Sequence, residues 1–554
     1  MLINVRRAPK GEWEEREAER GATLEDVYNE IKSELPYKVL AAKVNNEVVE
    51  LGYALEESCD VEFLDMRNQT ANLIYQHSLS LIYLKAVSDV LNCDDVEIQN
   101  SLNKGLYTEI HAERELTDTD IADVEMRMRE LVAQDIPLVK EIVDRDEALE
   151  ILEHDGRVEK QRLIASSLNL SYVRFYSLEG YRNFFYGLMV PSTGYVEYFQ
   201  LMKYRNGVLL RFPHPSKPNV IPEYVDEVKM YEAFGEQTRW DELLGVNFVE
   251  DLNEKIESGE YKSLIQVSEA LHEKKIAQIA DMIKTRKKRI ILIAGPSSSG
   301  KTTFARRLCV QLRVNGLRPL YMGTDDFFLE REETPRDENG DYDFENLEAL
   351  DIGLFNDCMN RLLKGETVDM PEFDFVTGHK TFGKNFTSVE EGQPIVIEGI
   401  HGLNGKLTEF IDDNEKFKIY ISPLTQLNID SHNRIPTTDE RMLRRMVRDN
   451  LYRGRNAQST IRDWPKVREG EDKNIFPYSN EADVFFNSYH VYEISVLRKY
   501  AEPLLLSITP MEEEYAEATR MLRFLRFFRK IEDDSIIVNN SIIREFIGGS
   551  IFVD

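Results

Sequence analysis

Gly295-Pro-Ser-Ser-Ser-Gly300-Lys301-Thr302-Thr303 is the stretch that decides the fold of the C-terminal half, because it matches the pattern G-x-x-x-x-G-K-[ST] at every fixed position. The preceding run, residues 289–294, is short, apolar and β-branched, which predicts a buried strand. Residues 303–312 predict a helix with Phe304, Leu308 and Leu312 on one face. A strand, a glycine turn and a helix in this order bring backbone N–H groups and a helix N-terminus to a phosphate.

We expect this loop to surround the phosphates of a nucleotide. Its members are Gly295, Pro296, Ser297, Ser298, Ser299, Gly300, Lys301, Thr302 and Thr303. In such a loop the lysine, here Lys301, reaches the β- and γ-phosphates, and the hydroxyl group of Thr302 ligates Mg²⁺. The alternative is a Ser/Gly turn without a ligand, which the agreement between the motif and its flanking elements disfavours.

Length and charge limit the classes of protein to which the chain can belong. The 554 residues are too many for one core and suggest roughly three or four domains. A hydrophobic content of 42% and a charged content of 30% are those of an ordinary globular protein. The net charge of −30 argues against a broad, non-specific nucleic-acid binder, although a local basic groove stays open.

Cysteine usage and hydrophobic runs indicate the compartment. The four cysteines, Cys59, Cys93, Cys309 and Cys358, show no Cys-x-x-Cys spacing, so the sequence supports neither a disulfide framework nor a zinc site. The N-terminus lacks the long apolar stretch of a signal peptide. No apolar run reaches the ~18 residues that span a bilayer. We therefore expect a cytoplasmic protein.

Residues 1–66 predict a small α/β unit. Leu2-Ile-Asn-Val5 is typical of a strand, and Thr23-Leu-Glu-Asp26 is a capping box that begins a helix. Residues 40–51 predict a hairpin with a tight turn at Asn45-Asn46, and residues 61–64 a last strand. The order strand, helix, hairpin, strand suggests a β-grasp. Through the hairpin sequence Leu40-Ala-Ala-Lys-Val-Asn-Asn46 and its position, this region resembles the TGS domain of threonyl-tRNA synthetase.

Residues 67–260 predict an α+β region. Leu116-Thr-Asp-Thr-Asp120 caps a helix that carries four apolar residues on one face, Ile121, Val124, Met128 and Leu131. Three stretches, Tyr75-Gln-His77-Ser78, Gly105-Leu-Tyr107 and residues 121–128, resemble the second accessory domain of threonyl-tRNA synthetase. This resemblance implies an editing site built from a His-x-x-x-His motif and a Cys-x-x-x-His motif.

The editing motifs are incomplete in this chain. His77 is followed four residues later by Leu81, and no Cys-x-x-x-His occurs anywhere. We therefore interpret His77 as a structural residue, because fold analogy alone does not carry function. We interpret the aromatic residues Phe184, Phe185 and Tyr186 as core or interface. The N-terminal half could still bind nucleic acid.

Two carboxylates follow predicted strands downstream of the loop. Asp325 follows the strand of residues 319–323, and Glu398 ends the buried strand of residues 394–398. The carboxyl ends of parallel strands lie at the edge of the sheet where ligands bind. Asp325 there can accept a proton from an attacking hydroxyl or bind Mg²⁺, and Glu398 can assist the metal. A helix-capping role for Asp325 is the alternative.

Arginines recur at helical spacing farther along the chain, at Arg441, Arg444, Arg445 and Arg448. In so acidic a chain, a row of arginines on one face predicts an anionic partner. Guanidinium groups that close over phosphates as a lid would provide one. The alternative is a salt-bridged surface helix.

Together these motifs resemble the phosphoribulokinase/uridine kinase family of P-loop kinases, of the bacterial nucleoside kinase type. The chain supplies the motifs of the family in order: residues 295–303, Asp325-Asp-Phe-Phe328, Pro371-Glu-Phe-Asp-Phe375, Glu398-Gly-Ile400 and residues 444–455. The resemblance implies ATP, Mg²⁺ and phosphorylation of a primary hydroxyl, the ribose 5′-OH of uridine or cytidine in uridine kinases. It assigns Asp325 as the base, with Asp326 as the alternative.

The resemblance also assigns the arginines and the acceptor site. Arg448 and Arg453 match arginines on the phosphates, with Arg448 also catalytic, and Arg445 and Arg455 match arginines near the acceptor. The acceptor side departs from the family pattern. Phe373 and Phe328 stand where the family has tyrosines, His379 is displaced by one residue, and Glu348 corresponds only loosely to the ribose-binding aspartate. Lost hydroxyl groups can change the choice of acceptor.

The sequence therefore predicts an α/β protein with four parts. Residues 1–66 form a TGS-like β-grasp, 67–260 an α+β accessory domain, 261–285 a helical linker and 286–554 a kinase domain with a mainly parallel, doubly wound sheet. The apolar face of residues 515–529 needs a partner surface on this chain or on a second copy, so a homo-oligomer stays open. The predicted function is a nucleoside kinase. A kinase for another alcohol or sugar phosphate, and an ATP-gated RNA- or ribosome-associated protein, are the alternatives.

Overall fold

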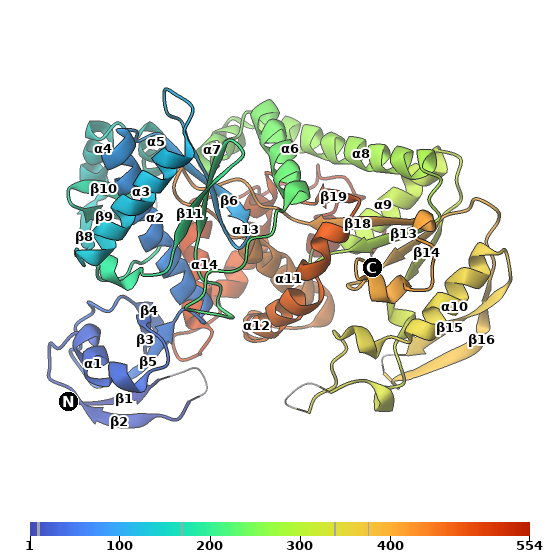
Figure 1. The fold of residues 1–554 in the computed structure, drawn as a ribbon, viewed down its shortest axis with the longest axis horizontal. Helices are drawn as coiled ribbons and strands as arrows, with labels where there is room; N and C mark the ends of the chain where they lie inside the picture. The colour runs from blue at the N-terminus through green and yellow to red at the C-terminus, as the bar shows by residue number, and fades with distance from the viewer. Residues whose placement is uncertain (8–10, 168–169, 337–339, 375, 554) are drawn as a thin grey trace.

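The computed structural model describes residues 1–554 apart from 8–10, 168–169, 337–339, 375 and 554. The N-terminal region is a β-grasp (Figure 1, blue). Its elements are β1 (Leu2–Arg6), β2 (Glu14–Glu17), α1 (Leu24–Ile31), β3 (Val39–Val44), β4 (Glu47–Val49) and β5 (Asp60–Asp65), with strand order β2-β1-β5-β3-β4. Thr23 forms the expected capping box with Asp26. Asn45 and Asn46 take positive φ angles of 46° and 65° at the hairpin turn, as two-residue turns require.

The middle region holds two antiparallel sheets, β10-β9-β8 and β11-β12-β7-β6. Its elements are α2 (Gln69–Leu91), β6 (Val96–Leu102), β7 (Gly105–Ile110), α3 (Asp118–Ala133), β8 (Val139–Asp144), α4 (Arg145–His154), α5 (Val158–Ser166), β9 (Tyr172–Leu178), β10 (Tyr181–Phe184), β11 (Gln200–Tyr204), β12 (Gly207–Arg211), α6 (Val228–Leu244) and α7 (Val249–Ser258). Helix α2 is the centre of one core and packs against α3. The four apolar residues predicted for α3 are all buried there.

The C-terminal region is built on a five-stranded sheet in which every neighbouring pair is parallel. Its strands are β13 (Ile290–Ala294), β14 (Leu320–Gly323), β17 (Ile395–Glu398), β18 (Lys416–Ser422) and β19 (Val484–Asn487), in the order β14-β17-β13-β18-β19. A separate hairpin joins β15 (Val368–Asp374) to β16 (His379–Thr387). All five residues of β13 are buried, as expected for a strand covered on both faces. The predicted parallel α/β architecture is confirmed.

Helices cover this sheet and extend beyond it. They are α8 (Tyr261–Thr285), α9 (Lys301–Val314), α10 (Ile352–Leu363), α11 (Thr437–Arg453), α12 (Ala457–Asn474), α13 (Glu493–Leu506), α14 (Tyr515–Leu525) and α15 (Arg544–Ile547). The segment predicted as a linker is α8, and its residues Ile276, Ile279 and Ile283 pack into one core with β13 and α9. Helix α8 therefore belongs to the packing of the C-terminal sheet while it connects that sheet to the middle region.

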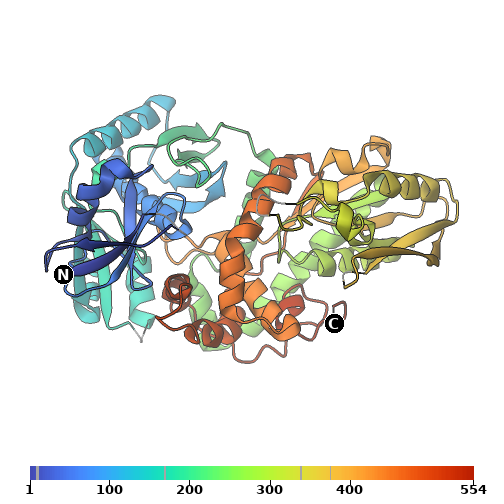
Figure 2. The same cartoon turned by 90° about the horizontal axis from the view of Figure 1, so that it is seen from below.

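The middle and C-terminal regions share a continuous core. Phe184 of β10 contacts Phe527, which follows α14, with ring centroids 6.1 Å apart. The apolar residues of the segment after Tyr515 thus find their partner surface on the same chain. Seen from below, α11 and α12 lie between the N-terminal half and the parallel sheet (Figure 2, orange). Two distant halves of the sequence therefore meet at these helices.

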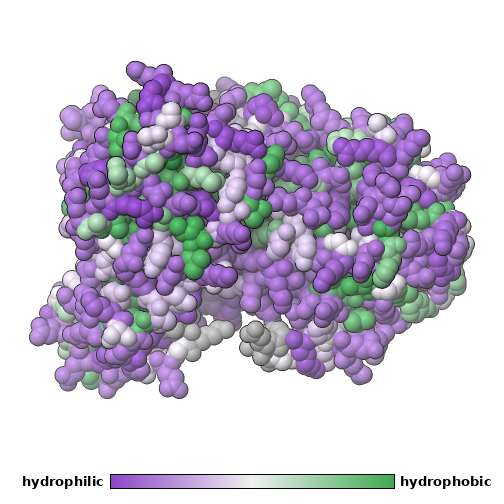
Figure 3. Space-filling model, viewed as in Figure 1, coloured by the Kyte–Doolittle hydropathy of each residue, from purple (hydrophilic) through white to green (hydrophobic). Residues whose placement is uncertain are grey.

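The outer surface carries mainly hydrophilic residues on the face drawn in Figure 3. Hydrophobic residues appear there as scattered groups. Across the described part of the chain, no helix has the length and apolarity to cross a membrane.

Candidate functional site

The phosphate loop lies between β13 and α9, and backbone geometry requires both of its motif glycines. A Cβ atom on Gly295 would lie 1.9 Å from the carbonyl oxygen of Ile421. Gly300 has a φ of 81°, and a Cβ atom there would lie 2.4 Å from Ile542. Only glycine fits positions with such a close approach or a left-handed backbone. The turn into α9 therefore depends on these two residues.

The side chain of Lys301 folds back onto the phosphate loop. Its Nζ donates to the carbonyl oxygens of Gly295 and Pro296, both at 3.0 Å. Burial lowers the pKa of Lys301, while the negative charges of Glu398, Glu545 and Glu471 act in the opposite direction. The ammonium group of Lys301, at the start of α9, is therefore surrounded by these three carboxylates.

Thr302 and Glu398 form a pair at the end of β17. The Thr302 hydroxyl donates to Glu398 Oε1 at 3.0 Å. The second oxygen, Oε2, is buried and makes no hydrogen bond within the described residues, and burial raises the pKa of this carboxyl. A buried carboxylate oxygen without a partner is costly. A divalent cation between Glu398 and a bound phosphate would satisfy it.

The residues present therefore fit a magnesium–nucleotide. The N-cap residue Gly300 offers no side chain to the first turn of α9, so that turn is open to an anion. The hydroxyl groups of Ser298 and Ser299 are buried and make no hydrogen bond in the described structure. Thr303 differs, because its N–H and its hydroxyl both donate to Glu545 Oε2, at 3.3 and 2.7 Å. Glu545, in the C-terminal segment, therefore binds the first turn of α9 through Thr303.

The two aspartates after β14 have different surroundings. Burial raises the pKa of Asp325, and the nearby charge of Lys301 opposes that shift. Asp325 nevertheless retains solvent exposure, so it borders the loop without being enclosed. Asp326 instead accepts a hydrogen bond from the Phe373 N–H at 3.4 Å and fixes the β15 strand. The side chain that faces the loop lysine is thus Asp325.

The arginine segment is α11, and its arginines divide into two sets. Arg441 and Arg444 are 2% and 0% exposed. Arg441 pairs with Glu471 and donates to the Ser297 carbonyl at 3.2 Å. Arg444 pairs with Glu493 and donates to the Ser298 carbonyl at 3.2 Å. For these two arginines the expected anionic partners are buried glutamates of the same chain, and both side chains hold the loop backbone.

The second set surrounds the buried Asp449. Arg445, Arg448 and Arg453 lie 3.4, 3.2 and 3.3 Å from its carboxylate oxygens. Arg445 also donates to the Ser297 hydroxyl at 2.9 Å. Three guanidinium groups around one carboxylate leave an excess of positive charge beside the loop. Burial lowers the pKa of Arg445, although Asp449 acts in the opposite direction.

Of the residues predicted on the acceptor side, Arg445 contacts the loop, and the others make different contacts. Glu348 is exposed, and His379 is bonded through Nδ1 to Glu330 at 2.6 Å. Phe373 is buried, with its ring 5.6 Å from that of Phe328. Arg455 is paired with Asp463. Among the described residues, neither Glu348 nor His379 makes a hydrogen bond or ion pair with residues 295–303.

Four residues near the loop carry no sequence motif and were missed. Glu471 accepts a hydrogen bond from the Ser297 N–H at 2.9 Å. Glu345 packs against Gly470. A Cβ atom added to Gly470 would lie 1.9 Å from the Oε2 atom of Glu345. His401 is 2% exposed, both of its ring nitrogens are without a hydrogen bond in the described structure, and burial lowers its pKa to about 4. Glu545 completes the set. The contacts of the three glutamates join segments far apart in sequence, so no local pattern could have indicated them, whereas His401 directly follows the Glu398-Gly-Ile400 motif.

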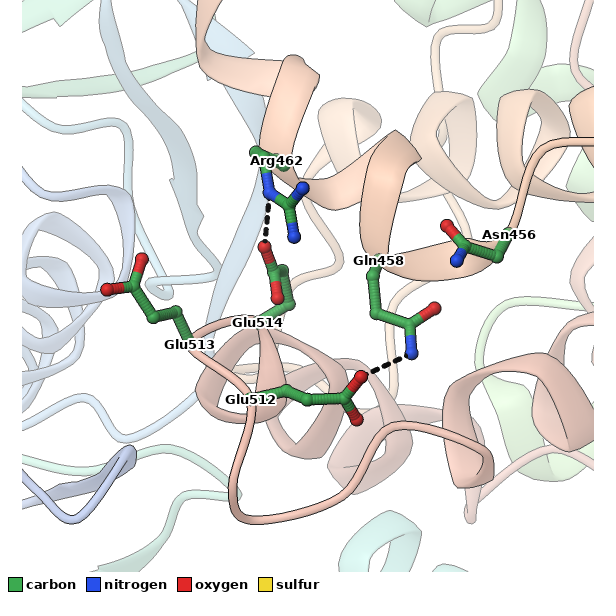
Figure 4. Close-up of a pocket in the computed structure, with 6 residues that line it drawn as sticks. All are labelled: Asn456, Gln458, Arg462, Glu512, Glu513 and Glu514. Atoms are coloured by element: carbon green, nitrogen blue, oxygen red, sulfur yellow. Dashed lines mark hydrogen bonds and ion pairs between the residues drawn. The ribbon is translucent and has the colours of Figure 1, made fainter.

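A separate hollow of about 320 Å³ lies where the start of α12 meets the segment before α14 (Figure 4). It is lined by Asn456, Gln458, Arg462, Glu512, Glu513 and Glu514. Arg462 donates to Glu514 at 2.8 Å, and Gln458 donates to Glu512 at 2.7 Å. Three carboxylates and one paired cation repel phosphate groups. The hollow is therefore no rival to the loop as a nucleotide site.

His77 lies in a packed environment in the middle region. Its ring centroid is 5.5 Å from that of Tyr186 and 6.1 Å from that of Phe185. A Cβ atom on Gly187 would lie 2.1 Å from the His77 ring. Burial lowers the pKa of His77 to about 4, so the imidazole is neutral. Phe184, Phe185 and Tyr186 are buried, in agreement with the predicted core role.

Family models match two segments of the chain. Residues 290–495 match the model of the Phosphoribulokinase / Uridine kinase family. Residues 3–65 match the model of the TGS domain. These segments contain the phosphate loop with α11 and the β-grasp, respectively.

Curated relatives are threonine–tRNA ligases. The protein of Methylobacillus flagellatus is 29% identical over 199 residues, which cover 36% of this chain and 31% of the relative. That of Marinobacter nauticus is 30% identical over 181 residues, 33% of this chain and 28% of the relative. The chain therefore spans about a third of the length of the curated relatives that it matches.

Solved structures with local similarity include two kinases. One is titled a possible uridine kinase from Bacillus stearothermophilus, with 22% identity, a TM-score of 0.26, and coverage of 38% of this chain and 97% of that chain. The other is a putative fructose transport system kinase from Silicibacter, with 19% identity, a TM-score of 0.27, and coverage of 38% and 98%.

The family models and the curated relatives assign each region of the chain. The N-terminal β-grasp is a TGS domain, and the middle region is related to threonyl-tRNA synthetases. The C-terminal region, with its phosphate loop between strand β13 and helix α9, carries a domain of the phosphoribulokinase/uridine kinase family.

Proposed function

We propose that this protein is an ATP-dependent kinase that phosphorylates a hydroxyl group of a small molecule, a nucleoside such as uridine or cytidine. The observation that carries the proposal is the group formed by Lys301, Asp325 and Glu398 at the carboxyl ends of three neighbouring strands. Lys301 opens α9 after β13, Asp325 follows β14, and Glu398 ends β17. A cation and two carboxylates beside an uncapped helix N-terminus suit phosphoryl transfer.

Binding of Mg·ATP is assigned to the loop and its neighbours. The open N–H groups of the first turn of α9 and Lys301 would hold the phosphates, and Thr302 with Glu398 would hold the metal. A bound Mg²⁺ neutralises charge on the phosphate oxygens. The surplus positive charge of Arg445, Arg448 and Arg453 supports binding of the same phosphates.

Asp325 is the proposed general base. It would accept the proton of the acceptor hydroxyl as that oxygen forms its bond to the γ-phosphorus and the bond to the leaving oxygen of ADP breaks. Loss of solvent around its carboxyl group raises the pKa of Asp325, while the charge of Lys301 opposes that shift, and a raised pKa favours the role of a base. Asp326 is a weaker candidate because it accepts a hydrogen bond from the β15 backbone.

The polar groups near the loop also suit acceptors other than a nucleoside. His379 is engaged by Glu330, whereas Glu345 lies beside Gly470, the neighbour of the Glu471 that binds the Ser297 N–H. Gly402, next to His401, packs 3.4 Å from Ala294 at the end of β13. Different polar groups near the reacting centre favour different acceptors. A kinase for another small alcohol or sugar phosphate is therefore the second candidate.

A third candidate belongs to a different class. The TGS domain and the relation to threonine–tRNA ligases favour an ATP-gated protein that binds RNA or the ribosome through its N-terminal half. The net charge of −30 opposes broad contact with a phosphate backbone. In this case ATP turnover would depend on RNA.

One panel experiment separates the three candidates. ADP release is measured with Mg·ATP and, in turn, nucleosides, sugar phosphates, other small alcohols and RNA. The Asp325→Asn variant, which lacks the proposed base, is expected to be inactive. The Asp326→Asn variant, changed at the neighbouring aspartate, is the matched control. Turnover with one nucleoside that Asp325→Asn abolishes and Asp326→Asn retains supports the proposal. Turnover with another alcohol names the second candidate, and turnover with RNA alone names the third.

A further inference from the structure

The segment that leads into α11 is fastened to the middle region. We name residues 425–436 the docking loop. Asn428 Nδ2 donates to the carbonyl oxygens of Ile98 and Gln99, both at 3.0 Å. The Ile98 N–H donates to the Ser431 carbonyl at 2.8 Å. The docking loop therefore continues the hydrogen bonding of β6, although more than 300 residues separate the two.

A second set of bonds joins the docking loop to the end of β10. Asn433 Nδ2 donates to the Phe184 carbonyl at 3.0 Å, and Asn433 Oδ1 accepts from the Tyr186 N–H at 3.1 Å. Asn433 is fully buried. One side chain thus satisfies a donor and an acceptor of the middle region at once.

A buried ion pair completes the attachment. Lys160 Nζ of α5 lies 2.7 Å from Asp430 Oδ1, and both side chains are at most 1% exposed. Asp430 also accepts hydrogen bonds from the N–H groups of His432 and Asn433, at 2.9 and 3.0 Å. A buried pair with its remaining lone pairs satisfied is held in one geometry. The docking loop is therefore a rigid element.

Helix α11 carries this fixed position to the phosphate loop. It begins at Thr437, directly after the docking loop, and its first turns present Arg441, Arg444 and Arg445. Ser297 is held at three atoms: its N–H by Glu471 at 2.9 Å, its carbonyl by Arg441 at 3.2 Å and its hydroxyl by Arg445 at 2.9 Å. A shift of α11 would therefore move the loop backbone itself.

We propose that the middle region positions the phosphate loop through the docking loop and α11, and that Asn433 and Asp430 are positioning residues for nucleotide binding. The threonyl-tRNA-synthetase-like region then supports the ATP site structurally, and residues Ala233 and Phe234 of its α6 also pack in one core with Ala294, the last residue of β13 before the loop. The kinetic part of this inference rests on the proposed kinase function. The conformational part concerns the loop alone.

The test compares two buried asparagines with the same bonding pattern. Asn433→Ala removes the two hydrogen bonds that the Asn433 side chain makes to Phe184 and Tyr186 of the middle region. Asn356→Ala is the matched control, because Asn356 is also buried and bonds the Leu407 carbonyl and the Phe410 N–H within the kinase domain. Asn428→Ala is a second variant in case Asn433→Ala does not fold. For each full-length protein we would measure thermal stability, Mg·ATP affinity, KM and kcat, and hydrogen exchange of the peptide that contains residues 295–303.

We expect Asn433→Ala to raise the dissociation constant and KM for ATP about tenfold, with a smaller change in kcat, and to speed exchange in the loop peptide. Asn356→Ala should lower stability without either effect. The inference is overturned if both variants change ATP affinity and loop exchange equally, or if neither changes them. If the wild-type protein binds no Mg·ATP, the proposed function fails, and loop exchange alone decides the inference.

Discussion

The phosphate loop and the surroundings of His77 are two regions in which a family motif meets the fold that normally carries it. Around the loop, the Glu398 Oε2 atom and the hydroxyls of Ser298 and Ser299 are buried without hydrogen bonds in the described structure. Around His77, aromatic rings and a glycine fill the space beside the imidazole. Among the described residues both regions hold buried polar atoms without a hydrogen bond, because His77 Nδ1 is another of them. Around the loop these atoms lie beside an uncapped helix N-terminus, whereas around His77 aromatic rings and a glycine occupy the adjacent space.

This difference shows how a fold and its chemistry separate. The middle region retains the relation to threonyl-tRNA synthetases, but its His77 packs edge-on against Tyr186. Several of its polar groups instead contact the docking loop, through Asn183, Phe184 and Tyr186. A domain that has lost its reactive groups can thus be retained for the surface that it offers to a neighbour.

The largest expected effect follows the replacement of Lys301. Lys301→Met should lower kcat/KM about 10³-fold, because a cation that stabilises charge on the transferred group is removed. Lys416→Met is the matched control, since Lys416 is also buried and donates to a backbone carbonyl, that of Thr408, at 2.7 Å. Steady-state kinetics with the acceptor found in the panel measure the effect. Equal losses in the two variants would remove the distinction between the loop and an ordinary buried lysine.

The ion pair of Arg441 and Glu471 is expected to matter next. Glu471→Leu leaves a buried guanidinium without its partner, which costs about 3–5 kcal/mol of unfolding free energy. The double variant Arg441→Met with Glu471→Leu should recover much of that loss, because the buried guanidinium is removed with its partner, and Arg468, which also pairs with Glu471 at 3.0 Å, is partly exposed. Urea unfolding of the three proteins provides the measurement. A double variant no more stable than the single one would show that the pair acts mainly through Ser297.

The pH dependence of turnover separates the two aspartates. Burial raises the pKa of Asp325, and the base must be ionised, so activity is lost as the pH falls through that raised pKa. We expect kcat/KM to fall about tenfold per pH unit below it. Asp326→Asn should keep this acid limb. An acid limb that disappears in Asp326→Asn would transfer the role of base to Asp326.

The sequence predicted the elements that local patterns encode. The strand and helix around the loop follow from the hydrophobic period and two glycines, and the β-grasp from the capping box at Thr23 and the Asn45-Asn46 turn. The pairing of Arg441 with Glu471 was out of reach, because it joins two helices through tertiary packing. The same holds for Glu545 and for the docking loop. Contacts between distant segments leave no period in the sequence, so the support of the loop became visible only in the fold.

The smallest expected effect concerns His77. His77→Phe keeps the ring that packs beside Gly187 and removes nitrogens that no catalytic group uses, so phosphoryl transfer should be unchanged and stability at pH 7 should change by less than about 1.5 kcal/mol. The native pKa of about 4 lies below the ordinary value of 6.5. The unfolded chain therefore binds a proton that the folded one does not, and the wild-type protein loses stability as the pH falls from about 6.5 toward 4.

His77→Phe lacks this proton uptake, so its stability should fall less steeply over the same range. The full shift corresponds to about 3 kcal/mol, and we expect less because part of the residue remains exposed. Urea unfolding of both proteins between pH 7 and pH 4 provides the measurement. Parallel curves would show that His77 is protonated in the folded protein. A loss of turnover in His77→Phe would give the histidine a functional role, and the contrast between a site open to ligands and one filled by packing would no longer hold.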